Sequence, residues 1–217
     1  MLEAVEIVNN FGEVIRELSE PLSKSIQNGF EMICRIFRIV SYAANPLEIA
    51  TSSKIIAKTL ELMANANIYE IMLKCIIGTD VESELKLAAL KTLSFVTCCF
   101  RFKFADFDGI NFVRNNQFLK INLFHPEFLK ILSVISCDNC IDTRYQALLS
   151  LAFIVEIDDE SRNILIQLKL VENLSPLITA DKLDWSHFEA IGCFVSSLVS
   201  CLSFAFNSAL DKSFLVT

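Results

Sequence analysis

One pair of cysteines has a spacing that can bind a metal ion. Cys137 and Cys140 form a CxxC motif, which holds zinc when two further ligands converge on it. The chain has no second CxxC, and the other candidate ligands are Cys98-Cys99 and two histidines. A single pair with no matching partner is more typical of a loop between helices. We therefore predict no metal site.

A second motif, Asp106-Phe107-Asp108-Gly109, has the spacing of the first residues of a calcium-binding loop. Counting from Asp106, position 12 of that loop is Gln117, where calcium loops need a bidentate glutamate. We predict no calcium site.

Phenylalanines alternate with charged residues between Phe100 and Phe107, and such rings could stack the bases of a single nucleic-acid strand. Asp106, together with Asp108 just after this stretch, offsets its two cations, and the whole chain has a net charge of −7. Nucleic-acid backbones and anionic membranes favour clustered positive charge instead. We predict no nucleic-acid partner and expect these phenylalanines to fold onto the helices as an irregular insertion.

No catalytic arrangement is visible. The sequence lacks a glycine-rich phosphate loop, a GxSxG and an HExxH, and two histidines offer little for acid–base chemistry. We interpret Asp158-Asp159-Glu160 as the solvated start of a helix. We therefore expect no enzymatic activity, no cofactor and no small-molecule substrate.

The composition indicates an all-α chain. With 5 Gly and 4 Pro in 217 residues there are few turn positions, which favours long helices over sandwiches and barrels. No secretory signal is visible at the N-terminus, so we expect the eight cysteines to be reduced thiols in the cytoplasm or nucleus.

Apolar periodicity predicts helices over most of the chain. Thr79 and Glu82 have the spacing of a capping box. On the second helix, Ile26, Phe30 and Ile33 belong to the apolar stripe. The predicted helices cover residues 2–18, 22–44, 47–63, 68–77, 80–98, 126–136, 145–155 and 162–169, with another from Leu170.

Residues 142–178 form three short helices that need a neighbour, because about 40 residues in this arrangement cannot enclose a core alone. Their pattern resembles the armadillo repeats of importin-alpha and beta-catenin type. The matching residues are Gln146-Ala147, Leu151, Glu160, Arg162, Val171, Leu174 and Leu177. The pattern departs at Lys169, where the family usually has glycine at a sharp turn. A lysine there must adopt a positive φ, or the turn is built differently.

The same template fits other helices when Ile33, Ala89 and Ala190 are aligned with Ala147. These anchors are 56, 58 and 43 residues apart in chain order. We therefore predict that residues 1–217 form one domain, an irregular, right-handed armadillo-like α-solenoid of about four units. An irregular insertion is expected near residues 100–125.

The resemblance also implies where a partner would bind. Armadillo proteins that bind basic peptides present a tryptophan and an asparagine on the third helix of each repeat. In this chain those slots hold Lys91 and Phe95, then Leu149 and Phe153, so the ladder for nuclear-import cargo is absent. We predict these four as the binding residues of a non-enzymatic scaffold for a partner peptide or helix. The alternative is that both phenylalanines pack between helix layers.

Residues 190–210 contain no charge over 21 positions, enough to span a bilayer. A polar stripe of three serines and Asn207 favours a buried helix instead, so we do not expect a membrane span. Two alternatives to the scaffold remain open: a membrane-associated helical protein using this segment, and a fragment of a larger helical-repeat protein.

Overall fold

The computed structural model describes residues 20–41, 46–101, 103–104, 107–138, 140–170 and 173. The elements in this part are helices, apart from one hairpin made of two strands of two residues each. The predicted all-α class is therefore confirmed. The chain separates into two compact units, Met1–Leu119 and Lys120–Thr217. The predicted helix at residues 2–18 and the segment 190–210 lie outside the described residues.

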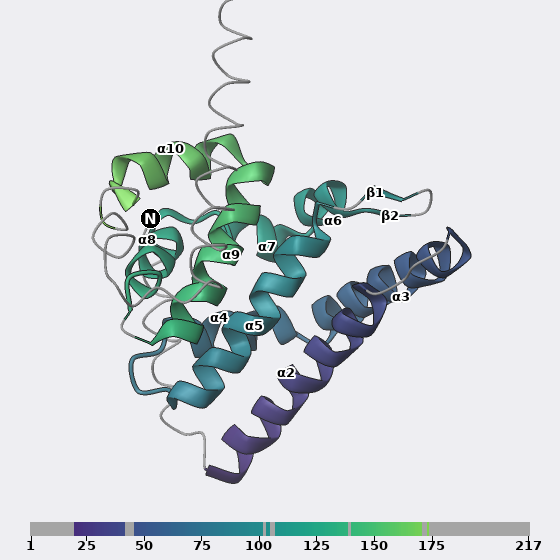
Figure 1. Cartoon of the computed structure of the whole chain (residues 1–217), viewed down its shortest axis with the longest axis horizontal. Helices are drawn as coiled ribbons and strands as arrows, with labels where there is room; N and C mark the ends of the chain where they lie inside the picture. The colour runs from purple at the N-terminus through teal and green to yellow at the C-terminus, as the bar shows by residue number, and fades with distance from the viewer. Residues whose placement is uncertain are drawn as a thin grey trace, which may run out of the picture. The chain divides into compact units, whose positions relative to one another are not determined.

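The helices are α2 Glu20–Ser41, α3 Pro46–Asn65, α4 Ile68–Ile77, α5 Ser83–Cys99, α6 Gly109–Asn115, α7 Gln117–Asn122, α8 Pro126–Ile135, α9 Ile141–Ile157 and α10 Asp159–Gln167 (Figure 1). The strands β1 Lys103–Phe104 and β2 Phe107–Asp108 pair antiparallel, with Phe104 opposite Phe107.

Helix α5 is the core of the first unit. Its buried residues occur on every side of the helix, as expected for an element with neighbours all round. It packs against α2 on one side and α4 on another. Its completely buried apolar side chains include Ala89, Leu90, Leu93 and Val96.

Helix α2 runs parallel to α5 and beside it (Figure 1). Near their N-terminal ends, the Ser23 hydroxyl donates to Glu82 Oε2 over 3.4 Å. Further along both helices, Cys34 Sγ lies 3.4 Å from Thr92 Oγ1. From the first contact to the second, the residue number rises on both helices, so α2 and α5 run parallel. Helices α3 and α4 make the return connection.

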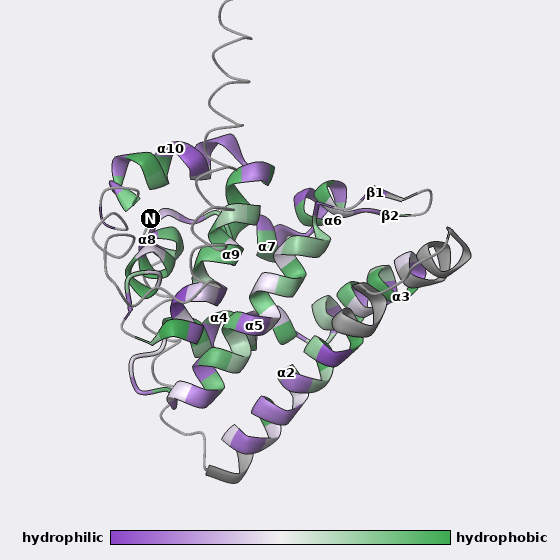
Figure 2. Cartoon of the chain, in the orientation of Figure 1, coloured by the Kyte–Doolittle hydropathy of each residue, from purple (hydrophilic) through white to green (hydrophobic). Residues whose placement is uncertain are grey.

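The buried face of α2 differs from the predicted stripe. Ser23, Gln27, Phe30 and Cys34 are buried, at the helical spacing i, i+4, i+7 and i+11. Ile26 and Ile33 are only half-buried. The polar members are tolerated because they form hydrogen bonds to α5 or along α2. Figure 2 shows the resulting alternation of hydrophilic and hydrophobic residues along this helix.

The predicted capping box at the start of α5 is wrong. Thr79 Oγ1 hydrogen-bonds to its neighbour Asp80, at 3.4 Å from Oδ1. The helix begins at Ser83 with Glu82 as its N-cap, and no side chain caps it. Glu82 instead accepts the hydrogen bond from Ser23 on α2. A contact between helices has replaced the local one.

In the second unit, α9 packs against α8 and α10. Asp158 caps α10, because its Oδ2 accepts from the Ser161 backbone N–H over 2.7 Å. The buried Arg162 donates to Val155 O at 3.2 Å and to Asp159 Oδ1 at 2.5 Å, which fixes the corner between α9 and α10.

One pair of helices in the first unit recurs in the second. Helices α4 and α8 each have 10 residues, and α5 and α9 each have 17. Every end of the second pair lies 58 residues after the matching end of the first, the offset predicted from Ala89 and Ala147. By that offset the irregular region occupies the place of α3, and contains β1, β2, α6 and α7.

A sharp turn with positive φ follows two of the helices. Asn67, between α3 and α4, has φ 54°, and Lys169, after α10, has φ 52°. Leu170 and Asn173 are helical, and Asn173 N donates to Lys169 O over 3.0 Å. Of the two options for Lys169, the structure shows the positive φ. This conformation costs most residues other than glycine about 1 kcal/mol of free energy. The cost is lower for asparagine, whose short polar side chain can form local hydrogen bonds.

We therefore expect Lys169→Gly to raise the free energy of unfolding by about 0.5–1 kcal/mol, measured by urea denaturation. Asn67→Gly is the matched control and should change it by only a few tenths of a kcal/mol, roughly, because asparagine tolerates this region. A destabilised Lys169→Gly chain would show that this turn has another conformation.

Candidate functional site

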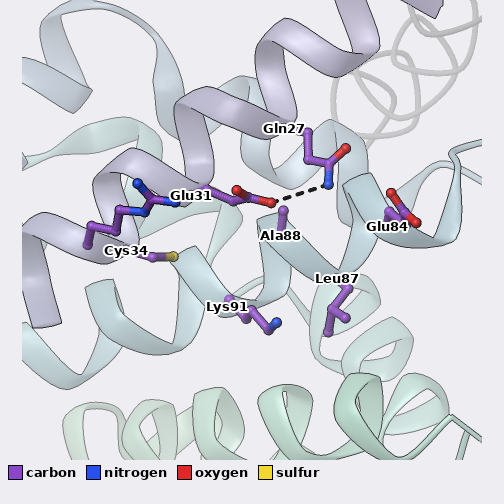
Figure 3. A pocket seen from close by; sticks show the side chains of 8 residues that line it. Gln27, Glu31, Cys34, Glu84, Leu87, Ala88 and Lys91 are labelled. Atoms are coloured by element: carbon purple, nitrogen blue, oxygen red, sulfur yellow. Dashed lines mark hydrogen bonds between the residues drawn. The ribbon is translucent and has the colours of Figure 1, made fainter.

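The first unit contains a groove of about 250 Å³ between α2 and α5 (Figure 3). Its walls come from two helices that are joined by α3 and α4, so the parallel packing of α2 on α5 creates it. The lining residues are Gln27, Glu31, Cys34, Arg35, Glu84, Leu87, Ala88 and Lys91.

Figure 3 shows Ala88 between the two walls of the groove, with Gln27 and Glu31 on the α2 side and Leu87 and Lys91 on the other. The Ala88 side chain is buried and small, which leaves open space above it. Gln27 is buried as well, and its Nε2 donates to Glu31 Oε1 over 3.3 Å. The Glu31 carboxylate is therefore held against the groove by a buried amide.

The charges of the groove are ordered along its length. On α2 the carboxylate Glu31 precedes Arg35, and on α5 the carboxylate Glu84 precedes Lys91. Because the helices run parallel, both cations are displaced from their carboxylates in the same direction. Neither cation forms an ion pair with another described residue.

One ion pair lies at the acidic end of the groove. Lys24 Nζ is 3.9 Å from Glu84 Oε2, and the two side chains are 63% and 74% exposed. Pairs this exposed contribute little, because water and salt screen them. Glu84 is therefore available to a competing cation.

Of the four predicted partner-binding residues, Lys91 lines the groove. Phe95 lies about one turn further along α5 and is half-buried. Leu149 and Phe153 hold the equivalent positions of α9 in the second unit, where both are half-buried. Their role in binding stays a prediction.

The α2 wall of the groove was not predicted from the sequence. The step of two residues from Ala89 to Lys91, applied to the anchor Ile33, leads to Arg35. The repeat template therefore contained the signal for this cation. Gln27 and Glu31 had no such signal, because only the packing of α2 on α5 turns them toward the groove.

The CxxC motif lies in the loop between α8 and α9, as predicted. Cys140 is the exposed N-cap of α9 and Cys137 is half-buried. Hydrogen bonds from Thr143 lower the pKa of the Cys140 thiol. Within the described residues, no three side chains of the metal-binding types converge. His125, one of the other candidate ligands, caps α8 by accepting from Glu127 N.

Phe100, Phe107 and Phe112 form an internal cluster. The Phe112 ring lies 6.1 Å from Phe100 and 6.2 Å from Phe107, between ring centroids. Phe100 and Phe107 are buried, so their faces are not available to stack bases. Gly109 lets this region approach α5, because a Cβ there would lie 2.6 Å from Phe100 O.

The buried titratable groups of the first unit are not poised to react. Burial raises the pKa of Tyr69 well above its usual range, and its hydroxyl donates to Leu60 O over 3.1 Å. Burial also raises the pKa of Cys75 to about 11 and that of Cys99 further. Thiols in this state remain protonated at neutral pH.

The part of the chain that the structure describes contains no helix that is both long and apolar enough to cross a bilayer. Comparisons with protein-family models, curated proteins and solved structures found no match.

The close approach at Gly109 predicts opposite effects of alanine at two glycines. Gly109→Ala should lower the free energy of unfolding by about 1–3 kcal/mol, because its Cβ would overlap backbone atoms that cannot rotate away. Gly29, on the exposed side of α2, has no atom within 4 Å of such a Cβ. Gly29→Ala should therefore raise it by about 0.5–1 kcal/mol. Chemical denaturation measures both, and equal effects would contradict the packing described here.

Proposed function

We propose that the chain is a non-enzymatic protein-interaction scaffold with an armadillo-like solenoid architecture. The observation that carries the proposal is the groove between two parallel helices, with Lys91 at the position that the repeat pattern assigned to partner contact. A fixed, elongated surface with ordered charges suits the recognition of a protein segment.

The repeated local structure supports the solenoid part of the proposal. Helices α4 and α5 recur as α8 and α9 at a constant offset of 58 residues. Parallel packing of α2 on α5 is the relation expected between equivalent helices of successive repeats. Repeats of this kind bury their apolar faces against their neighbours and present one helix of each to partners.

The side chains of the groove also favour binding over catalysis. Cys34, the one thiol in it, is buried and lies against the Thr92 hydroxyl, at 3.4 Å. The remaining polar groups are carboxylates, cations and an amide, which form hydrogen bonds and ion pairs with a peptide. We propose a protein partner in the cytoplasm or nucleus, where the six described free cysteines would stay reduced.

The test compares the native chain with a Phe95→Ala, Phe153→Ala variant in affinity capture from a eukaryotic lysate. Each captured partner is then purified and its dissociation constant measured with both forms. Truncating two aromatic anchors should weaken binding about tenfold or more. Circular dichroism and thermal melting establish that the variant is folded.

The matched control truncates two apolar side chains outside the predicted slots. Met32 on α2 and Val134 on α8 are 65% and 69% exposed, so Met32→Ala, Val134→Ala should leave the affinity unchanged. A folded phenylalanine variant that binds every partner as tightly as the native chain would refute the role of Phe95 and Phe153. A chain with no partner would refute the scaffold.

A further inference from the structure

We infer that the groove between α2 and α5 binds an extended peptide segment that carries one cation and one anion, about three residues apart. This inference rests on the proposed function and specifies its ligand. The cation of the peptide pairs with Glu84 and the anion with Lys91, and Glu31 and Arg35 on α2 follow the same order of charge.

The spacing follows from the geometry of α5. Glu84 and Lys91 are two turns apart, which at the helical rise of 1.5 Å per residue is about 10 Å. An extended chain advances about 3.3 Å per residue, so its matching charges are about three residues apart. Because α2 is parallel to α5 and has the same order of charges, both walls favour the same orientation.

The balance of charge excludes peptides of a single sign. The groove has two carboxylates and two cations, so a wholly basic or wholly acidic segment is repelled at one end as it is attracted at the other. A segment with both signs gains at both ends.

The size of the groove favours an extended segment over a helix. An α-helix with its side chains is about 10–12 Å across. The groove encloses only about 250 Å³, which is too little for an element of that width. The buried Ala88 leaves room for peptide backbone or a small side chain, and Leu87 provides an apolar wall. The partner should therefore have small residues between its two charges.

The Glu31 carboxylate is already oriented before a peptide binds. Gln27 is nine-tenths buried, accepts from Lys24 Nζ through its Oε1 and donates to Glu31 through its Nε2, each over 3.3 Å. Lys24 also lies near Glu84 and competes there with an incoming cation. Removing the Lys24 ammonium should consequently strengthen binding.

The experiment uses the full chain and fluorescent, terminally blocked peptides with the cores Lys-Ala-Ala-Glu, Lys-Ala-Ala-Lys and Glu-Ala-Ala-Glu. Dissociation constants are measured by fluorescence anisotropy at low salt. The mixed peptide should bind about tenfold more tightly than either single-sign peptide, and lose most of this advantage at high salt. Equal affinities for all three would overturn the inference.

Protein variants locate the binding site. Glu84→Lys and Lys91→Glu should each weaken binding of the mixed peptide about fivefold, and Lys24→Ala should strengthen it about twofold. The matched controls are Glu61→Lys and Lys54→Glu on α3, which make the same charge changes at exposed positions outside the groove. If groove and control variants have equal effects, the peptide is bound elsewhere.

The same variants separate this inference from the proposed function. A partner that binds the native chain, depends on Phe95 or Phe153 and ignores both charge reversals would leave the scaffold intact and refute the charge-paired groove. If neither a partner nor the mixed peptide binds the folded chain, both proposals fail.

Discussion

The packing of α2 along α5 is the interaction on which the first unit depends. At its centre is Thr92, whose completely buried hydroxyl donates to Ala88 O over 2.9 Å and also lies 3.5 Å from Phe30 O on α2. The contact with Cys34 completes this set. A buried hydroxyl is costly without partners, so these hydrogen bonds favour one register of α2 on α5.

That register has a direct consequence for the surface. It turns Gln27 and Glu31 of α2 toward Leu87 and Lys91 of α5, and it gives both walls of the groove the same order of charges. Along each helix the carboxylate precedes the cation, so the groove presents an acidic end and a basic end to a ligand of mixed charge.

Local features were predictable from the sequence, and contacts between helices were not. The bounds of α4 were predicted because Gly78 and the apolar run define them, and the 58-residue spacing of Ala89 and Ala147 is the offset observed between α5 and α9. The capping box failed because Glu82 accepts a hydrogen bond from Ser23, 59 positions earlier. Periodicity pointed to Ile26 and Ile33, whereas hydrogen bonding allowed Ser23 and Gln27 to be buried.

The most direct test of the account is a cross-link between α2 and α5. With Cys34 Sγ 3.4 Å from Thr92 Oγ1, a Thr92→Cys chain under mild oxidation should form a disulfide between Cys34 and the introduced cysteine, detected by peptide mass mapping. Thr97→Cys, equally buried on α5 but hydrogen-bonded within its own helix, is the control and should not link to Cys34. The parallel register would be contradicted if Cys34 stays free in the Thr92→Cys chain. It would also be contradicted if Cys34 links equally well to the introduced cysteine of the Thr97→Cys control.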